Sequence, residues 1–119
     1  MLSTASGADA SAAHRLDLVF RALGDQTRRK MLSRLAVGPA IVSELAQPFS
    51  MSLPAVGKHL KVLERAGLVR REVDGRIHNC SLSPLPLHEA ERWLDQYRQF
   101  WEGTLAALSD HFDDPAGRD

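Results

Sequence analysis

Apolar residues recur every three or four positions in the N-terminal half of the chain, a spacing that predicts short amphipathic helices. A first helix is predicted over residues 14–23, with one apolar face formed by Leu16, Val19, Phe20 and Leu23. Residues 1–13 are small and polar and have no apolar period. We therefore expect a disordered leader over residues 1–13.

Three further helices follow, each with a recognisable start or end. Asp25 is placed to cap a second helix that stops before Gly38. A third, short helix must end just before Pro48, because the residue that precedes a proline is disfavoured in the helical region. Ser52 can cap a fourth helix over residues 52–66, and Gly67 suits the left-handed conformation that ends it.

Between residues 68 and 82 the apolar period changes, and β-branched residues flank Asp74 and Gly75, a dipeptide typical of β-hairpins. The returning strand has on one face His78, Cys80 and Leu82. This pattern predicts that the one cysteine of the chain is a small core residue and not a reactive thiol.

The last apolar pattern is the longest and predicts a single helix over residues 84–112, about 40 Å long at 1.5 Å per residue. Its stripe consists of Ala90, Leu94, Tyr97, Trp101, Leu105, Leu108 and Phe112, widened by Trp93 and Phe100. A body of this size cannot cover such a helix, and aromatic residues are enriched in interfaces. We predict a homodimer helix; an intramolecular core helix is the alternative. Residues 113–119 are predicted to be a flexible acidic tail.

Composition narrows the class of protein. A length of 119 residues, 44% hydrophobic and 25% charged, fits one globular domain. No apolar run is long enough for a membrane span, and the N-terminus lacks the pattern of a secretory signal, so we expect a cytoplasmic protein. We find no nucleophile with a base, no paired carboxylates and no glycine-rich phosphate loop, which argues against an enzyme.

The formal net charge is zero, but the charges are unevenly distributed. Residues 14–82 carry 12 Lys or Arg against 6 Asp or Glu, whereas residues 83–119 carry 3 against 8. A basic body with an acidic tail points to a nucleic-acid surface on the body.

The order of elements predicts a mainly α fold with a small β-hairpin, a winged helix-turn-helix over residues 14–112 that ends in a long dimerisation helix. In such a fold one helix enters the major groove while a preceding helix braces it and the hairpin reaches the backbone. The helix 52–66 carries cations opposite its apolar face, and the wing 70–76 adds others. The candidate DNA-binding residues are Ser52, Leu53, Pro54, Gly57, Lys58, His59, Lys61, Arg65, Arg71 and Arg76.

The chain resembles the ArsR family of winged-helix transcriptional regulators in residues 22–35 (ALGDQTRRKMLSRL), 42–46 (VSELA), 52–69 (SLPAVGKHLKVLERAGLV) and 74–76 (DGR). The resemblance covers about residues 16–112. It implies a homodimer that binds double-stranded operator DNA, usually as a repressor that an inducer releases. Dimerisation in the family uses the first and last helices, here 14–23 and 84–112. The candidate interface residues are Leu16, Phe20, Trp93, Tyr97, Phe100, Trp101, Leu105 and Leu108.

The chain departs from the family's metal-sensing members. Ile41 and Ser43 occupy the positions of their Cys-x-Cys pair. The Asp-x-His and His-x-x-Glu pairs of other members are absent, and the nearest substitutes are His88 with Glu91 and the isolated His111. We therefore expect no metal and no cofactor, and any inducer is unidentified.

Several roles stay open at this stage. Gly57, where the family often has Ser, reflects either close approach to DNA or drift, and His59 is either a DNA contact or a partly buried, satisfied histidine. Thr27, Arg28 and Arg29 fit an exposed helix better than a DNA contact. The rival readings of the whole chain are a metal- or small-molecule-responsive regulator of the same fold, and a winged helix that binds only proteins.

Overall fold

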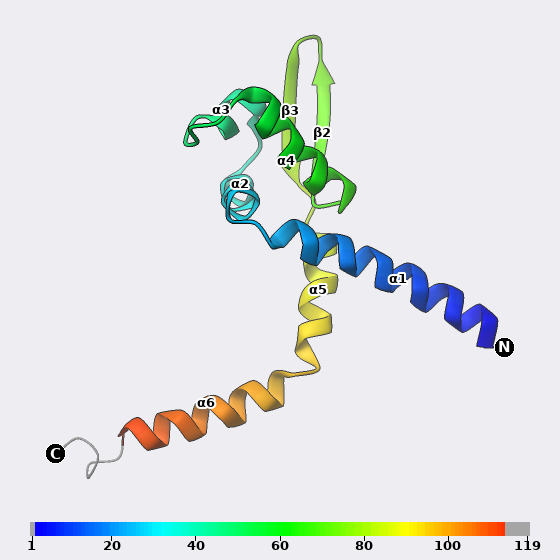
Figure 1. The fold of residues 1–119 in the computed structure, drawn as a ribbon, viewed down its shortest axis with the longest axis vertical. Helices are drawn as coiled ribbons and strands as arrows, with labels where there is room; N and C mark the ends of the chain where they lie inside the picture. Colours follow the sequence, from blue (N-terminus) through cyan, green and yellow to red (C-terminus); the bar gives the residue numbers. More distant parts are fainter. Residues whose placement is uncertain (1, 114–119) are drawn as a thin grey trace.

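The computed structural model describes the backbone of residues 2–113 and the side chains of residues 10–109. The elements follow the order α1 (Leu2–Leu23), α2 (Gln26–Val37), β1 (Ala40–Ile41), α3 (Val42–Ala46), α4 (Leu53–Arg65), β2 (Val69–Asp74), β3 (Ile77–Leu82), α5 (Leu85–Asp95) and α6 (Arg98–Asp113). In Figure 1, α2, α3, α4 and the β2–β3 hairpin form one body, α1 and α5 cross below it, and α6 extends away. The predicted mainly helical, winged helix-turn-helix class is confirmed.

The helix ends that the sequence marks most clearly are found where predicted. Asp25 caps α2 by accepting a hydrogen bond from the backbone N–H of Arg28, at 3.0 Å. Ser52 caps α4 by accepting from the backbone N–H of Ala55, at 3.3 Å. Gly67, with φ of 76°, follows the end of α4. These local signals fix the orientation in which α4 enters and leaves the body.

The hairpin pairs β2 with β3 from Val69 opposite Leu82 to Asp74 opposite Ile77, so the two-residue loop is Gly75-Arg76. Gly75 has φ of 63°, which the first position of such a tight turn requires. The sequence did not predict β1, whose two residues pair with Asn79 and Cys80 in the middle of β3. The wing is therefore anchored to the body through β3.

The core lies where α1, α2, α4 and the base of the sheet meet. Its fully buried large side chains are Val19, Met31, Leu45, Val56, Leu60, Leu63, Leu68 and Cys80. Three of them, Val56, Leu60 and Leu63, form the inward face of α4, as predicted. Cys80 is buried, which confirms its place in the core.

The first helix is longer than the sequence analysis predicted. Residues 2–13, expected to belong to a disordered leader, continue α1 as helix from Leu2. The segment is rich in alanine, which loses no side-chain entropy on forming a helix, so local propensity extends the helix without an apolar period.

The predicted single helix over residues 84–112 is wrong, because α5 ends at Asp95 and α6 begins at Arg98. At the break the backbone N–H groups of Gln96 and Tyr97 donate to carbonyls three residues back, those of Trp93 and Leu94. Arg98 Nη2 pairs with Asp95 Oδ1 at 2.6 Å across the break. Residues 114–119, in the predicted tail, lie outside the described residues, as do the side chains of His111 and Phe112.

The protein is unusually extended for its length. Its radius of gyration is 19.6 Å, whereas a closely packed chain of this length has about 13.5 Å. The excess comes from α1 and from the α5–α6 arm, which leave the body in different directions (Figure 1). No helix within residues 2–113 is long and apolar enough to cross a membrane.

Candidate nucleic-acid interface

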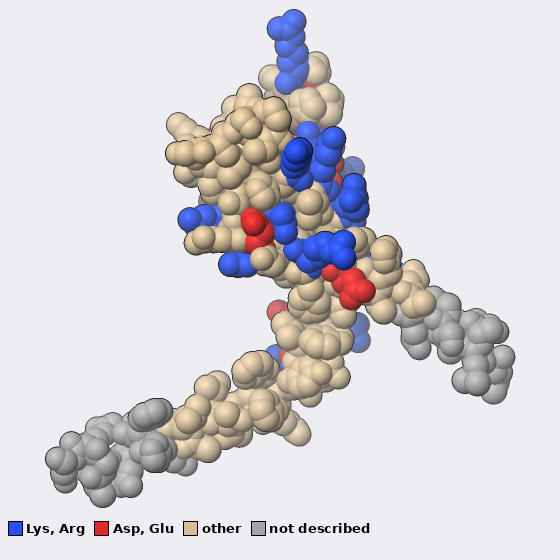
Figure 2. All heavy atoms as spheres, viewed as in Figure 1, with Lys and Arg blue, Asp and Glu red and all other residues tan. Residues whose placement is uncertain are grey.

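Helix α4 presents a basic face opposite the side that it buries. Lys58, Lys61 and Arg65 are exposed, as are Leu53 and Pro54 at its N-terminal end. Figure 2 shows Lys and Arg side chains gathered over the body around α4. The cations that the sequence placed on one helix face are thus brought together there.

Gly57 has no packing reason to be a glycine. A Cβ at this position would meet no protein atom within 4 Å. The glycine therefore leaves a low point on the exposed side of α4 between Pro54 and Lys58, where another molecule's surface can approach the backbone closely.

The wing stands beside this face and carries Arg76 exposed at its turn. Between the wing and the start of α4 lies a groove of about 410 Å³, bordered by Val42, Leu53, Arg76 and Ile77. The sequence analysis missed the half-buried Val42 and the exposed Ile77 as lining residues of this groove. An apolar residue next to a hairpin turn, such as Ile77 with 56% exposure, was the signal that could have identified it.

Arg71 does not project freely from the wing. Its guanidinium donates to Oε1 of Glu64 on α4, and its Nη1 lies 3.3 Å from His78 Nδ1 on β3. The Arg71 side chain is 19% exposed. Arg71 therefore braces the wing against α4, and the expectation that it is a free, phosphate-facing cation needs revising. Glu64, which sequence reasoning missed, is its partner.

His59 joins a second brace, at the other side of α4. Its Nδ1 lies 3.3 Å from Arg28 Nη1 and 3.7 Å from Asp25 Oδ2, both at the start of α2. The His59 side chain is partly buried. Of the two roles left open for His59, this geometry supports the satisfied histidine.

Arg28 and Arg29 hold the end of α1. Arg28 donates to the carbonyls of Ala22 and Arg21 at 2.8 and 2.9 Å, and Arg29 donates to the carbonyl of Leu23 at 2.7 Å. Cations at a helix C-terminus satisfy its free carbonyls and offset its partial negative charge. These two arginines therefore fix α1 to α2, and Thr27 beside them is half-buried.

Asp25 should make stability depend on pH. The backbone N–H of Arg28 is the main reason why the pKa of the Asp25 carboxyl lies below its ordinary value of 3.8, with further help from the charges of Arg28 and His59 against a desolvation effect that raises the pKa. A carboxylate with a depressed folded-state pKa stabilises the fold above its unfolded pKa, and this contribution is lost as pH falls through the folded pKa. Below about pH 5, the free energy of unfolding should fall less steeply in Asp25→Asn, which keeps a capping oxygen, than in the wild type. Urea unfolding at pH 3 to 7 measures this, and equal slopes would contradict it.

The candidate dimer residues form two aromatic groups. Phe20 of α1 stacks edge-to-face on Trp93 at 5.6 Å between ring centroids, and Trp93 does so on Tyr97 at 5.3 Å. On α6, Phe100 stacks on Trp101 at 6.1 Å. No ring contact between described residues joins the two groups. Leu16 is half-buried against the core, whereas Leu105 and Leu108 are exposed on α6.

The residues considered for metal binding stay apart. Within residues 10–109, no three His, Cys, Asp or Glu side chains come together in a way that could hold a metal ion. Ile41 and Ser43 border the groove beside the wing, and His88 and Glu91 are exposed on α5. Burial raises the pKa of the Cys80 thiol, so the thiolate needed for a soft metal is disfavoured.

Comparison with known proteins gives a consistent family. Residues 25–71 match the family model described as bacterial regulatory protein, arsR family. The chain is 39% identical over 97 residues to the HTH-type transcriptional regulator Rv2034 of Mycobacterium tuberculosis, covering 82% of this chain and 88% of the relative. It is 32% identical over 76 residues to the transcriptional repressor SdpR of Bacillus subtilis, covering 64% and 84%.

Comparison with solved structures gives the same family. A crystal structure of an ArsR family transcriptional regulator, 43% identical in sequence, superposes with a TM-score of 0.72 over 76% of this chain and 93% of that one. The family match, residues 25–71, spans α2 to α4 and the first residues of the wing. This chain belongs to the ArsR family of winged helix-turn-helix transcriptional regulators.

Proposed function

We propose that the protein binds operator DNA as a homodimer, with α4 of each protomer in a major groove. The observation that carries this proposal is the exposed face of α4, where Lys58, Lys61 and Arg65 lie opposite the buried Val56 and Leu60. A solvent-facing helix needs no such one-sided charge, whereas a helix in the major groove lies between two phosphate backbones.

The proposed DNA contacts of α4 are of two kinds, base contacts near its N-terminal end and phosphate contacts further along. Leu53, Pro54 and Gly57 lie in its N-terminal turns, the part of a recognition helix that reaches base edges, and Lys58 follows directly after them. Ser52 fixes this end as the cap. Lys61 and Arg65 on the helix and Arg76 on the wing serve as phosphate contacts. Arg71 and His59 act through Glu64 and Arg28, by holding the wing and α2 in place.

The α5–α6 arm supports the proposed homodimer. In the single chain, α6 leaves exposed apolar side chains that a second copy would cover, among them Phe100, Trp101, Leu105 and Leu108. A palindromic operator would require the two copies of α4 to lie about one DNA turn, or roughly 34 Å, apart. Two further exposed aromatic residues lie closer to the body, Trp93 on α5 and Tyr97 at the break between α5 and α6.

Repression is the mode of action that we propose, since one relative is named a transcriptional repressor. A protein that occupies operator DNA must share a compartment with the genome, so we place this regulator in the bacterial cytoplasm. We propose no catalytic role for it. A winged helix that binds only proteins would have no need of the cations on α4 and at the wing turn.

Selection of bound fragments from the source genome tests the function. The wild type should enrich fragments that share a palindromic motif, whereas a Lys58→Glu, Lys61→Glu double variant should enrich none, because two reversed charges repel the phosphates. The control is Glu91→Lys, which changes charge on α5 and should enrich the same motif. If the double variant recovers the motif as well as the wild type, α4 is not the DNA-binding element.

Zinc and soft metals should leave operator binding nearly unchanged. Ile41 and Ser43 lack thiolates, and the described histidines are dispersed. A ligand shifts an equilibrium only by its differential affinity for the two states. We expect a change of less than about threefold in operator affinity, a coupling under about 0.7 kcal/mol, when zinc or copper(I) is added or chelated. Titration of labelled operator measures it, and a tenfold shift would restore the metal-responsive reading.

A further inference from the structure

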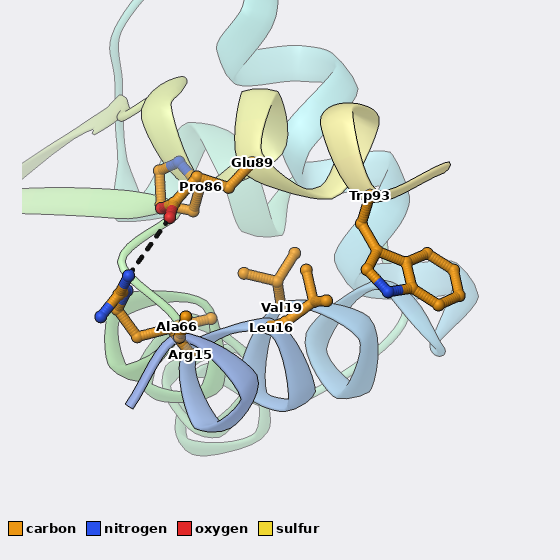
Figure 3. Close-up of a pocket in the computed structure, with 8 residues that line it drawn as sticks. Arg15, Leu16, Val19, Ala66, Pro86, Glu89 and Trp93 are labelled. Atoms are coloured by element: carbon orange, nitrogen blue, oxygen red, sulfur yellow. Dashed lines mark hydrogen bonds and ion pairs between the residues drawn. The ribbon is translucent and has the colours of Figure 1, made fainter. Parts of the chain in front are cut away.

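A pocket lies between α1 and α5, and Arg65 is the one proposed DNA contact that borders this region. Figure 3 shows it between the two helices, with Trp93 at one end and the Arg15–Glu89 ion pair at the other. Its walls are mostly apolar and include Leu16, Val19 and Ala66. Its volume is about 180 Å³, similar to cavities of about 150 Å³ that hold one benzene ring.

At the Arg15 end lies a second, wider hollow of about 650 Å³, the mouth, which shares Arg15, Ala66, Pro86 and Glu89 with the pocket. Three arginines line this mouth, namely Arg15, Arg65 and Arg92, against one carboxylate, Glu89. Glu89 lies 3.4 Å from Arg15. Among the described residues, neither Arg65 nor Arg92 forms an ion pair, so two positive charges remain available there.

The start of α5 adds to the positive potential of the mouth. Pro84 occupies its N-cap position and makes no side-chain hydrogen bond to the first turn. Leu85 and His88 of that turn line the mouth. Pro86 has no N–H, and that of His88 donates to the carbonyl of Pro84. Leu85 and Leu87 therefore carry the N–H groups of this turn that favour a negative charge.

We propose that this pocket and its mouth bind a small organic acid, with the apolar body between α1 and α5 and the carboxylate among Arg15, Arg65 and Arg92. An apolar interior with a few convergent polar groups at one end is the usual form of a small-molecule site. A purely apolar ligand would leave the arginines of the mouth unused. An inorganic anion would leave the pocket empty.

The site touches α1, the end of α4 and the start of α5 together. A ligand there contacts both the proposed recognition helix, through Ala66 and Arg65, and the proposed dimer helix, through Trp93. This makes the acid a candidate inducer, a consequence that rests on the proposed function. Binding itself does not rest on it, so binding is tested first without DNA.

Octanoate is the probe, and the indole N–H signals in the NMR spectrum are the readout. The chain has two tryptophans, of which Trp93 lines the pocket and Trp101 does not. Octanoate should shift the Trp93 signal in a saturable way and leave the Trp101 signal in place. Octanamide, of the same shape without the charge, should bind about tenfold more weakly, because it loses the interactions of the carboxylate with the mouth.

Ala12→Phe should abolish the shift, because Ala12 is exposed at the pocket wall and a larger side chain there would occupy the space. Ala13→Phe is the matched control, since Ala13 is exposed but does not line the pocket, and its affinity for octanoate should stay within twofold of the wild type. Equal affinity for octanoate and octanamide, or equal shifts at both indoles, would overturn the proposal. If Ala12→Phe lost the dimer as well as the shift, the proposal would also be overturned, because this result would mean that a second copy covers the groove.

The regulatory consequence is tested separately, with labelled operator. Saturating octanoate should weaken operator binding at least fivefold in the wild type and in Ala13→Phe, and leave Ala12→Phe unchanged. A saturable Trp93 shift with unchanged operator affinity would support the site and contradict its coupling to DNA. If neither the wild type nor the variants bound operator even in the absence of octanoate, the proposed function would be contradicted. The result on octanoate binding would still stand.

Discussion

Leu105→Glu should convert the protein to monomers that no longer bind operator DNA, and Trp101→Ala should do the same. Both residues lie on α6, where Leu105 is 60% and Trp101 53% exposed in the single chain. A buried, unpaired carboxylate or the loss of a large aromatic contact at an interface centre costs about 2 kcal/mol or more, which raises the dimer dissociation constant at least thirtyfold. Sedimentation at micromolar concentration and operator titration measure the two losses together.

Val37→Glu is the matched control for this experiment. Val37 is also an exposed apolar residue, at 86%, but it ends α2 and does not belong to the arm. This variant should stay dimeric. A wild type that sediments as a monomer yet binds a palindromic operator tightly would show that the proposed interface is wrong.

Lys61→Ala and Arg76→Ala should each weaken binding to all DNA sequences alike and lower the salt dependence. A cation that neutralises one phosphate contributes about one unit to the slope of log affinity against log salt concentration. Both side chains are exposed, one on α4 and the other at the wing turn. Titrations between 50 and 200 mM salt should therefore show a slope reduced by about one unit in each variant.

Arg71→Ala should behave differently, because the structure pairs Arg71 with Glu64. We expect weaker binding from a displaced wing, with a slope within about half a unit of the wild type. Arg98→Gln, on the arm and paired with Asp95, is the control and should change neither quantity. Unchanged slopes for both Lys61→Ala and Arg76→Ala would remove the proposed DNA face.

The sequence predicted those parts of the fold that depend on neighbours along the chain. The caps Asp25 and Ser52 each act within about three residues, so residue type and position were sufficient. The dipeptide Asp74-Gly75 marked the hairpin, but Asp74 still pairs with Ile77, so the loop lies one residue later than predicted. The inward face of α4 followed from its helical period for the same reason.

Two helix boundaries could not be read from the apolar period. The apolar stripe continues from Trp93 through Tyr97 to Trp101, so it gives no sign of the break at Gln96 and Tyr97. In the opposite sense, residues 2–13 lack an apolar stripe but continue α1. A stripe reports which side of a helix is covered, and it does not report where a helix bends or begins.

The exposure of charged side chains was predicted well for those that face solvent and poorly for those that face each other. Lys58, Lys61 and Arg65 share a helix face, which spacing alone shows. The pairing of Arg28 with His59 joins residues 31 positions apart, and no local pattern identifies it. Arg71 and Glu64 are closer in sequence but meet only because the chain reverses at Gly67. Tertiary packing decided which cations remained free.

The wing has a graded stability along its length. Only Asn79 and Cys80 of β3 have strands on both sides, because β1 is two residues long, whereas the pairs from Val73–His78 to the turn belong to a two-stranded ribbon. Isolated ribbons of two strands are marginal in water. Amide hydrogens near Gly75 should thus exchange far sooner than those at Cys80, through local opening that leaves the core intact. Arg76 is carried on a tip that can adjust to the width of the groove it meets, while the base keeps its register.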